Sequence, residues 1–238
     1  MWVSKIRGRG PFLRNKPLEV AGSHYNNPEK RDEPAGGLFV KKLVDSYFEG
    51  LYAALENVQY TGQQGEQLDR AEAYERALRL AMEATDRGCK LMFVGNGGSA
   101  AIASHMAIDF TKNGGMPAVC FNDGAALTCM GNDFGYEEVF AGQLRSHARK
   151  GDVLIAISSS GRSENILRAV AVARSRGCAV ITMSGFKPGN PLRALGDVNF
   201  HLGSCEYGLV EVAHTAMIHA LVDLKMANSP MAGARLSE

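Results

Sequence analysis

The stretch Lys90–Lys112, KLMFVGNGGSAAIASHMAIDFTK, determines which fold and which chemistry the sequence predicts. Its first part, Leu91–Val94, is an apolar run of strand length; the glycine-rich turn Gly95–Ser99 and a helical pattern of small and apolar residues follow. Backbone N–H groups without partners at such a turn, together with the helix dipole, favour a bound anion. The expected anion contacts in this turn are Asn96, Gly97, Gly98 and Ser99.

Two titratable side chains follow further along the same predicted helix. His105 and Asp109 are four residues apart, so they share one helix face. An acid/base pair beside an anion site indicates chemistry on a phosphorylated small molecule.

A second polar turn, Ser158-Ser159-Ser160-Gly161-Arg162-Ser163, lies between the apolar run Val153–Ile157 and another helical pattern. Four hydroxyl groups at a helix N-terminus can bind the oxygens of one phosphoryl group. A helix cap would need only one of them, so we favour phosphate binding. Arg162 could add charge to the site or point into solvent. The expected phosphate contacts are Ser158, Ser159, Ser160 and Ser163.

A dinucleotide site is an alternative for the glycine turn. The turn also fits the looser pattern G-x-G-x-x-A, and Asp123 follows at a distance suitable for a ribose contact. The serine-rich turn has no task in such a site, so we expect no nucleotide cofactor.

From Cys89 onward, short apolar runs alternate with helical patterns. This alternation is typical of an α/β fold with a doubly wound, mainly parallel, five-stranded sheet covered by helices on both faces. Ligands of such sheets bind at the carboxyl ends of the strands. The expected strands are Leu91–Val94, Ala118–Phe121, Val153–Ile157, Ala179–Met183 and Val198–Leu202. The expected helices are Ala100–Thr111, Ala125–Met130, Glu137–His147, Glu164–Arg176, a short one near Leu192, and Val210–Met226.

Two helical patterns, Leu38–Gln59 and Glu66–Arg87, precede this alternation and form a predicted N-terminal helix pair. Their apolar stripes must be buried, and we favour a helix bundle in a homo-oligomer. Residues 1–37 are basic and rich in Gly, Pro and Asn without periodicity, which predicts a flexible tail. Residues 38–238 then form a single domain.

Composition excludes several classes of protein. The formal net charge of +1 gives no indication of a nucleic-acid or acidic-lipid partner. The five cysteines lack C-x-x-C spacing, so we expect reduced thiols. No apolar run has the length of a membrane span, and no signal peptide is apparent. We expect a cytoplasmic protein without a membrane partner.

The last predicted helix carries Glu211, His214 and His219. The two histidines diverge by about 140° around a helix of 3.6 residues per turn, so they do not share one task. A histidine on an apolar helix is usually a core or interface residue. Glu211 and His219 would, however, join His105 and Asp109 in a site for a Zn²⁺-like ion if the two helices meet.

Asn132 and Asp133 occupy a predicted polar break after Ala125–Met130. They could line a sugar pocket as loop residues, or form an Asx turn or a helix N-cap. The residues themselves favour neither reading.

Four segments together resemble the sugar isomerase (SIS) domain family: FVGNGGSAAIASHMA, LTCMGNDFGYEEVF, GDVLIAISSSGRSENILRA and EVAHTAMIHAL. Within that family they are most similar to the phosphoheptose isomerases, which convert sedoheptulose 7-phosphate to a heptose 7-phosphate. The resemblance runs from about Leu38 to Met226. It implies an aldose–ketose isomerase that works through an enediol, and a homotetramer with active sites where subunits meet.

The resemblance also implies a role for individual residues. The base of the family falls on Asp109 and its acid histidine on His219. The family's zinc-binding set falls on His105, Asp109, Glu211 and His219, which implies one Zn²⁺ per subunit. Its substrate contacts fall on Asn96, Gly97, Gly98, Asn132, Asp133, Ser158, Ser159, Ser160, Ser163 and Glu211.

Three departures from the family pattern leave the exact phosphosugar open. Asp109 replaces a glutamate and Glu211 replaces a glutamine, while Gly208-Leu209-Val210 stands where the family has an Asp-Arg pair. They are also consistent with a second hypothesis, in which the chain is a non-catalytic SIS protein that senses a phosphosugar or bridges protein partners. The presence of both His105 and His219 favours the enzyme.

Overall fold

The computed structural model describes residues 37–228. The chain divides into two units, Met1–Val44 and Asp45–Glu238, and the structure describes only the opening turns of α1 from the first. Its helices are α1 (Gly37–Glu56), α2 (Arg70–Asp86), α3 (Gly98–Lys112), α4 (Gly124–Phe134), η1 (Tyr136–Glu138), α5 (Ala141–His147), α6 (Glu164–Ser175), η2 (Pro191–Ala194) and α7 (Tyr207–Ala227). Its strands are β1 (Gln59–Gly62), β2 (Gln67–Leu68), β3 (Leu91–Gly95), β4 (Ala118–Cys120), β5 (Val153–Ser158), β6 (Ala179–Gly185) and β7 (Val198–Leu202).

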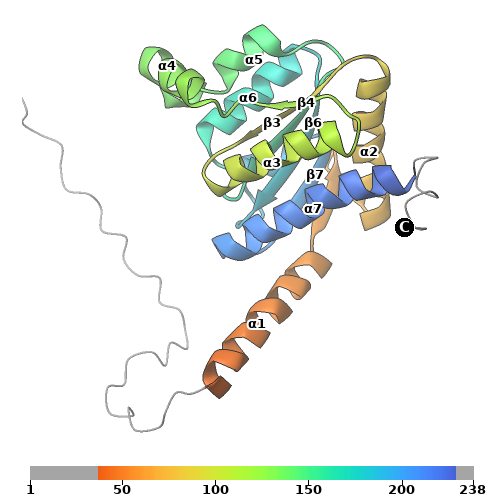
Figure 1. The fold of residues 1–238 in the computed structure, drawn as a ribbon, viewed down its shortest axis with the longest axis vertical. Helices are drawn as coiled ribbons and strands as arrows, with labels where there is room; N and C mark the ends of the chain where they lie inside the picture. Colours follow the sequence, from red (N-terminus) through yellow and green to blue (C-terminus); the bar gives the residue numbers. More distant parts are fainter. Residues whose placement is uncertain (1–36, 229–238) are drawn as a thin grey trace, which may run out of the picture. The chain divides into compact units, whose positions relative to one another are not determined.

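The seven strands form one sheet in the order β2-β1-β7-β6-β5-β3-β4. Figure 1 shows α3 and α7 lying across one face of this sheet. Strands β3 to β7 pair in parallel, and β1 runs antiparallel to β7 and β2. All five predicted strands are present. The predicted strand number of five is wrong. Strand β1 begins at Gln59, the last residue of the first predicted helix, and β2 falls inside the predicted helix Glu66–Arg87, whose counterpart α2 begins only at Arg70.

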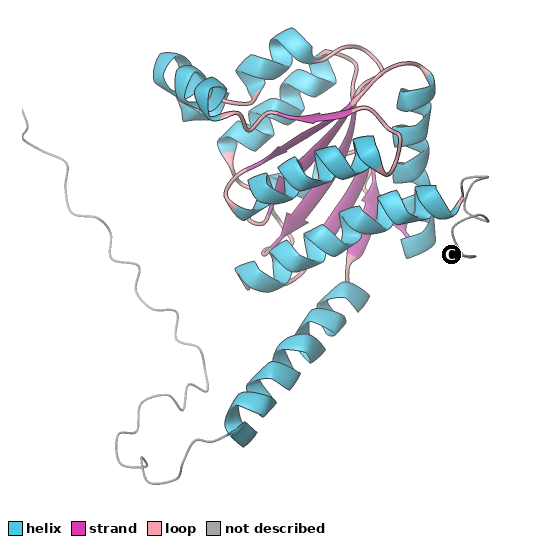
Figure 2. Ribbon diagram, in the orientation of Figure 1, coloured by secondary structure: helices cyan, strands magenta, loops and turns pink. Residues whose placement is uncertain are grey.

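Alternate side chains of the central strands point to opposite faces of the sheet and fill two cores. Leu91 and Phe93 belong to the core that α2, α3 and α7 cover, whereas Met92 and Val94 belong to the core under α5 and α6. Figure 2 shows these helical layers on the two sides of the strands. Burial on both faces explains why the strands read as continuous apolar runs.

The two predicted N-terminal helices correspond in range to α1 and α2. Alanines of α2, such as Ala73 and Ala77, pack without exposure against the sheet. The packing of α1 and α2 as a pair stays a prediction. The predicted basic tail lies outside the described residues. None of the helices in residues 37–228 is both long enough and apolar enough to span a membrane.

A buried asparagine ties the additional strand β1 to the parallel sheet. The side chain of Asn199 on β7 accepts hydrogen bonds from Thr182 Oγ1 on β6 (2.7 Å) and the Gly196 N–H (2.8 Å). Its Nδ2 donates to the carbonyls of Thr61 and Gly62 on β1 (both 3.3 Å). Buried amide groups need such partners, so this network fixes β1 in its register.

Two histidines lie buried near the carboxyl ends of β6 and β7. His201 Nδ1 is 3.1 Å from Ser184 Oγ, and His214 Nε2 is 3.2 Å from the Ser184 carbonyl oxygen. The other ring nitrogen of each histidine has no partner among the described residues. Burial lowers the pKa of each imidazole to about 4, because the charged form is poorly solvated there.

We predict that the free energy of unfolding falls as the pH drops from about 6.5 to about 4. Unfolded histidines take up protons near pH 6.5, while the folded ones stay neutral down to about pH 4, so acid favours the unfolded chain. Urea unfolding at several pH values measures this slope. The double variant His201→Asn/His214→Gln should flatten it, and the exposed His147→Gln should not; equal slopes in all three proteins would contradict the prediction.

Candidate active site

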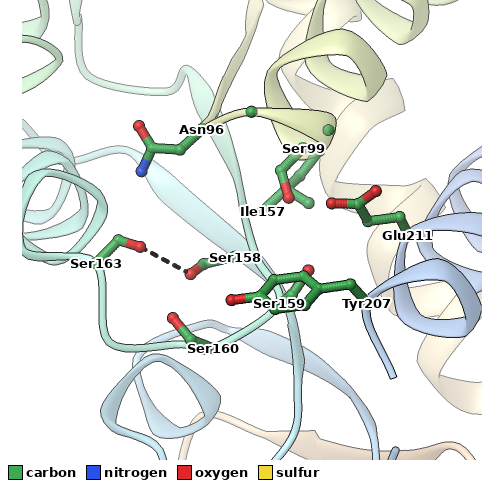
Figure 3. A pocket seen from close by; sticks show the side chains of 11 residues that line it. Asn96, Ser99, Ile157, Ser158, Ser159, Ser160, Ser163, Tyr207 and Glu211 are labelled. Atoms are coloured by element: carbon green, nitrogen blue, oxygen red, sulfur yellow. Dashed lines mark hydrogen bonds between the residues drawn. The ribbon is translucent and has the colours of Figure 1, made fainter. Parts of the chain in front are cut away.

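The glycine turn and the serine turn meet in one pocket of about 210 Å³ (Figure 3). They meet because β3 and β5 are parallel neighbours, with Gly95 paired to Ile157, so the segments that follow both strands leave the same edge of the sheet. The pocket is lined by Asn96, Gly97, Gly98, Ser99, Ile157, Ser158, Ser159, Ser160, Ser163, Tyr207 and Glu211.

The glycine turn brings backbone close to the opposite wall of the pocket. A Cβ atom added at Gly98 would overlap the carboxylate of Glu211 on α7, so only glycine fits here without a shift of that side chain. Gly98 and Ser99 are the first residues of α3, where backbone N–H groups have no partner within the helix. The predicted contacts Asn96, Gly97, Gly98 and Ser99 therefore all lie at the pocket.

The serine turn presents its hydroxyl groups to the same space. Ser163 occupies the N-cap position of α6, yet its side chain makes no capping hydrogen bond; its Oγ lies 3.4 Å from Ser158 Oγ instead. Ser163 is thus the N-cap residue by position, but its hydroxyl group does not cap α6. Gly161 closes the turn with a φ of 60°, and the Asn190 side chain fills the place that a Cβ at Gly161 would take.

Hydrogen bonds fix the orientation of the Asn96 side chain. Asn96 Nδ2 donates a hydrogen bond to Asn165 Oδ1, and Asn96 Oδ1 accepts one from Asn165 Nδ2 (both 2.9 Å). Tyr136 Oη also donates to Asn96 Oδ1 (3.1 Å). Sequence reasoning missed these roles of Asn165, which is buried in α6, and Tyr136; the amide directly after the serine turn was the only signal.

The pocket holds little positive charge of its own. Neither lysine nor arginine is among its lining residues, and Arg162 of the serine turn is exposed outside it. Its donors are backbone N–H groups and hydroxyls, and Glu211 contributes a carboxylate. Tyr207, one helical turn before Glu211 on α7, lines the pocket as well and was not predicted.

The predicted acid/base residues form a second cluster between α3 and α7, which pack against each other. His219 Nδ1 lies 3.2 Å from Asp109 Oδ2, and the rings of His105 and His219 are 5.2 Å apart between centroids. Asp109 Oδ1 also accepts a hydrogen bond from Asn113 Nδ2 (2.7 Å). The structure therefore brings together residues that are more than a hundred positions apart in the chain.

One ligand atom from each of His105, Asp109 and His219 lies within 4.8 Å of the others. Two imidazole nitrogens and a carboxylate oxygen are a donor set that suits Zn²⁺ with an open coordination position. Glu211 is not in this cluster. It lies eight positions before His219 on α7, and its carboxylate lies against Gly98 at the pocket.

The acid/base cluster and the pocket are separate within one chain. Neither Asp109 nor His219 lines the pocket. Ten residues of α3 separate Ser99 from Asp109, which corresponds to a rise of about 15 Å.

Asn132 and Asp133 lie in the last turn of α4 rather than in a loop, so the predicted polar break is wrong. Helix α4 continues through them to Phe134 and ends at Gly135, which has a φ of 91°. Within this last turn Asn132 Nδ2 donates to Asp133 Oδ1 (2.8 Å). Both are exposed and lie outside the lining of the pocket. Asp123, considered for a ribose contact, is instead the N-cap of α4 and accepts from the Ala126 N–H (3.0 Å).

Comparison with known proteins gives consistent matches. The model of the SIS domain family matches residues 56–185. The phosphoheptose isomerase of Helicobacter hepaticus is 38% identical over 158 residues, which cover 64% of this chain and 80% of the relative.

Solved structures match as well. The phosphoheptose isomerase GmhA of Neisseria gonorrhoeae is 32% identical with a TM-score of 0.68, and the match covers 78% of this chain and 99% of the other. A phosphoheptose isomerase of Francisella tularensis is 27% identical with a TM-score of 0.66, covering 78% and 97%. The chain belongs to the SIS domain family, and within it to the phosphoheptose isomerases.

Proposed function

We propose that this protein is an aldose–ketose isomerase that converts sedoheptulose 7-phosphate to D-glycero-D-manno-heptose 7-phosphate through an enediol. The observation that carries the proposal is the 3.2 Å contact between Asp109 and His219 on neighbouring helices, in a chain that also forms a hydroxyl-lined phosphate pocket. The names of the relatives, at 35–38% identity, support the same reaction.

The pocket would hold the phosphoryl group. Serine hydroxyls and the N-terminal N–H groups of α6 donate hydrogen bonds to phosphoryl oxygens, and the dipole of α6 adds favourable potential. The paired amides of Asn96 and Asn165 keep one wall rigid, which lowers the entropy lost when the ligand binds.

Isomerisation needs one proton to move between C1 and C2 and another between their oxygens. In this proposal the Asp109 carboxylate removes the proton from C1 of the ketose and returns it to C2. The His219 imidazole moves the proton between the two oxygens. Asn113 and His219 both bind the carboxylate and so hold it in one orientation.

We further propose that His105, Asp109 and His219 hold a Zn²⁺ ion. When bound, such an ion would polarise the substrate's carbonyl oxygen as a Lewis acid. Glu211, the fourth predicted ligand, lies outside this set in the described chain.

The complete site would combine the pocket of one subunit with the acid/base pair of another in a homotetramer. The separation of the two within one chain supports this. Helix α1 also exposes large apolar side chains that a subunit contact would bury, namely Phe39, Val40, Leu43, Val44, Tyr47, Phe48 and Tyr52.

The function is tested by incubating the protein with sedoheptulose 7-phosphate and analysing the products. We expect a heptose 7-phosphate to form with zinc-loaded protein, and to form more slowly after chelation. Binding of the phosphosugar without any product, with or without metal, would favour the non-catalytic SIS protein instead.

We expect Asp109→Asn to lower turnover by about 10²–10⁴-fold, because it removes the general base while keeping the side-chain shape. Calorimetry should show that sedoheptulose 7-phosphate still binds. Asp223→Asn, an exposed carboxylate on α7, is the matched control and should keep normal turnover. Normal turnover in Asp109→Asn would exclude Asp109 as the base.

Mixed oligomers test whether two subunits share each site. We expect Ser160→Ala/Ser163→Ala and Asp109→Asn each to be weakly active alone, since one damages the pocket and the other the acid/base pair. Co-expressed, they should regain activity, because some sites then combine an intact pocket with an intact pair. A mixture no more active than its components would place pocket and pair in the same subunit.

A further inference from the structure

Tyr207 forms a wall of the pocket that no motif predicted. It is the first residue of α7, its side chain is 63% exposed, and it lines the pocket opposite the glycine turn. In Figure 3 its ring lies across the pocket and its hydroxyl group points toward the serine turn, beside Ser158 and Ser160. The hydroxyl is therefore placed to reach a ligand held by those serines.

An aromatic contact holds the ring in this position. Phe186 and Tyr207 pack edge to face, with centroids 4.8 Å apart and an interplanar angle of 84°. Phe186 has a φ of 59°, the only positive φ of a non-glycine residue in the described part of the chain. Its N–H donates to the Ser204 carbonyl oxygen (2.9 Å). A bulky residue in the left-handed region is costly and often marks a functional position.

The charges around the pocket indicate what the hydroxyl group binds. Tyr207 and Glu211 are four residues apart on α7, so both face the pocket from one side. The Glu211 carboxylate lies against Gly98 and repels a phosphoryl group from that end, whereas the hydroxyl groups of a sugar can donate hydrogen bonds to it. A phosphoryl group is thus favoured at the other end, between the serine turn and Tyr207.

We infer that the Tyr207 hydroxyl donates a hydrogen bond to the phosphoryl group of the bound phosphosugar, and that Phe186 is a positioning residue for the Tyr207 ring. This inference rests on the proposed function for the identity of the ligand. It adds a neutral donor to a pocket that no lysine or arginine lines.

The first experiment measures binding of inorganic phosphate and of sedoheptulose 7-phosphate to the full-length protein by calorimetry. We expect Tyr207→Phe to weaken both by about tenfold, because a hydrogen bond to a charged group is lost while the ring is kept. Tyr60→Phe removes a tyrosine hydroxyl in the core, away from the pocket, and should change neither affinity.

The second experiment separates the ring of Phe186 from its backbone. Phe186→Gly fits the positive φ but lacks the ring, and we expect it to raise KM severalfold with little change in kcat. Phe186→Tyr keeps the aromatic contact and should restore normal KM. Circular dichroism checks that each variant is folded.

Four outcomes would overturn the inference. If Tyr207→Phe bound both ligands with unchanged affinity, the Tyr207 hydroxyl would not contact the ligand. If it bound only the phosphosugar more weakly, the hydroxyl would contact the sugar and not the phosphoryl group. Normal KM in Phe186→Gly would remove the positioning role. If the unsubstituted protein bound neither ligand, the proposed function would fail as well, whereas binding insensitive to Tyr207 overturns this inference alone.

Discussion

The parallel pairing of β3 with β5 is the constraint on which the pocket depends. Because Gly95 and Ile157 are register partners, both strands end at the same level and release their turns side by side. Two turns separated by about sixty residues can then surround one small ligand. Helix α7 closes the remaining side with Tyr207 and Glu211. The phosphate site is thus a property of sheet register as much as of serine and glycine content.

The distribution of charge makes the two ends of the pocket different. Its binding groups are neutral, and its one lining carboxylate, Glu211, lies at the glycine end. A ligand with a phosphoryl group at one end and hydroxyl groups along its length suits this polarity, and a ligand with two phosphoryl groups does not. The aromatic pair of Phe186 and Tyr207 adds a rigid wall at the end where we expect the phosphoryl group to bind. These features favour monophosphorylated sugars over nucleotides.

Local sequence signals predicted the five central strands and the two turns, because apolar runs and glycine or serine clusters act over short distances. The same signals could not predict β1 and β2, because these strands are only four and two residues long and form through pairing with β7 and with each other. The contact of Asp109 with His219 depends on how α3 and α7 pack. The sequence could therefore predict it only on the condition that the two helices meet. Tyr207 escaped prediction because its place is set by Phe186, twenty-one residues earlier.

The contact between Gly161 and Asn190 limits which substitutions the serine turn can accept. Asn190 occupies the space of a side chain at position 161, and it also caps η2 through Oδ1. A side chain added at Gly161 would collide with Asn190 and displace the backbone of the serine turn, even though neither residue lines the pocket. Removal of a single serine hydroxyl leaves this backbone path intact, whereas a side chain at position 161 would move all the hydroxyl groups of the turn together.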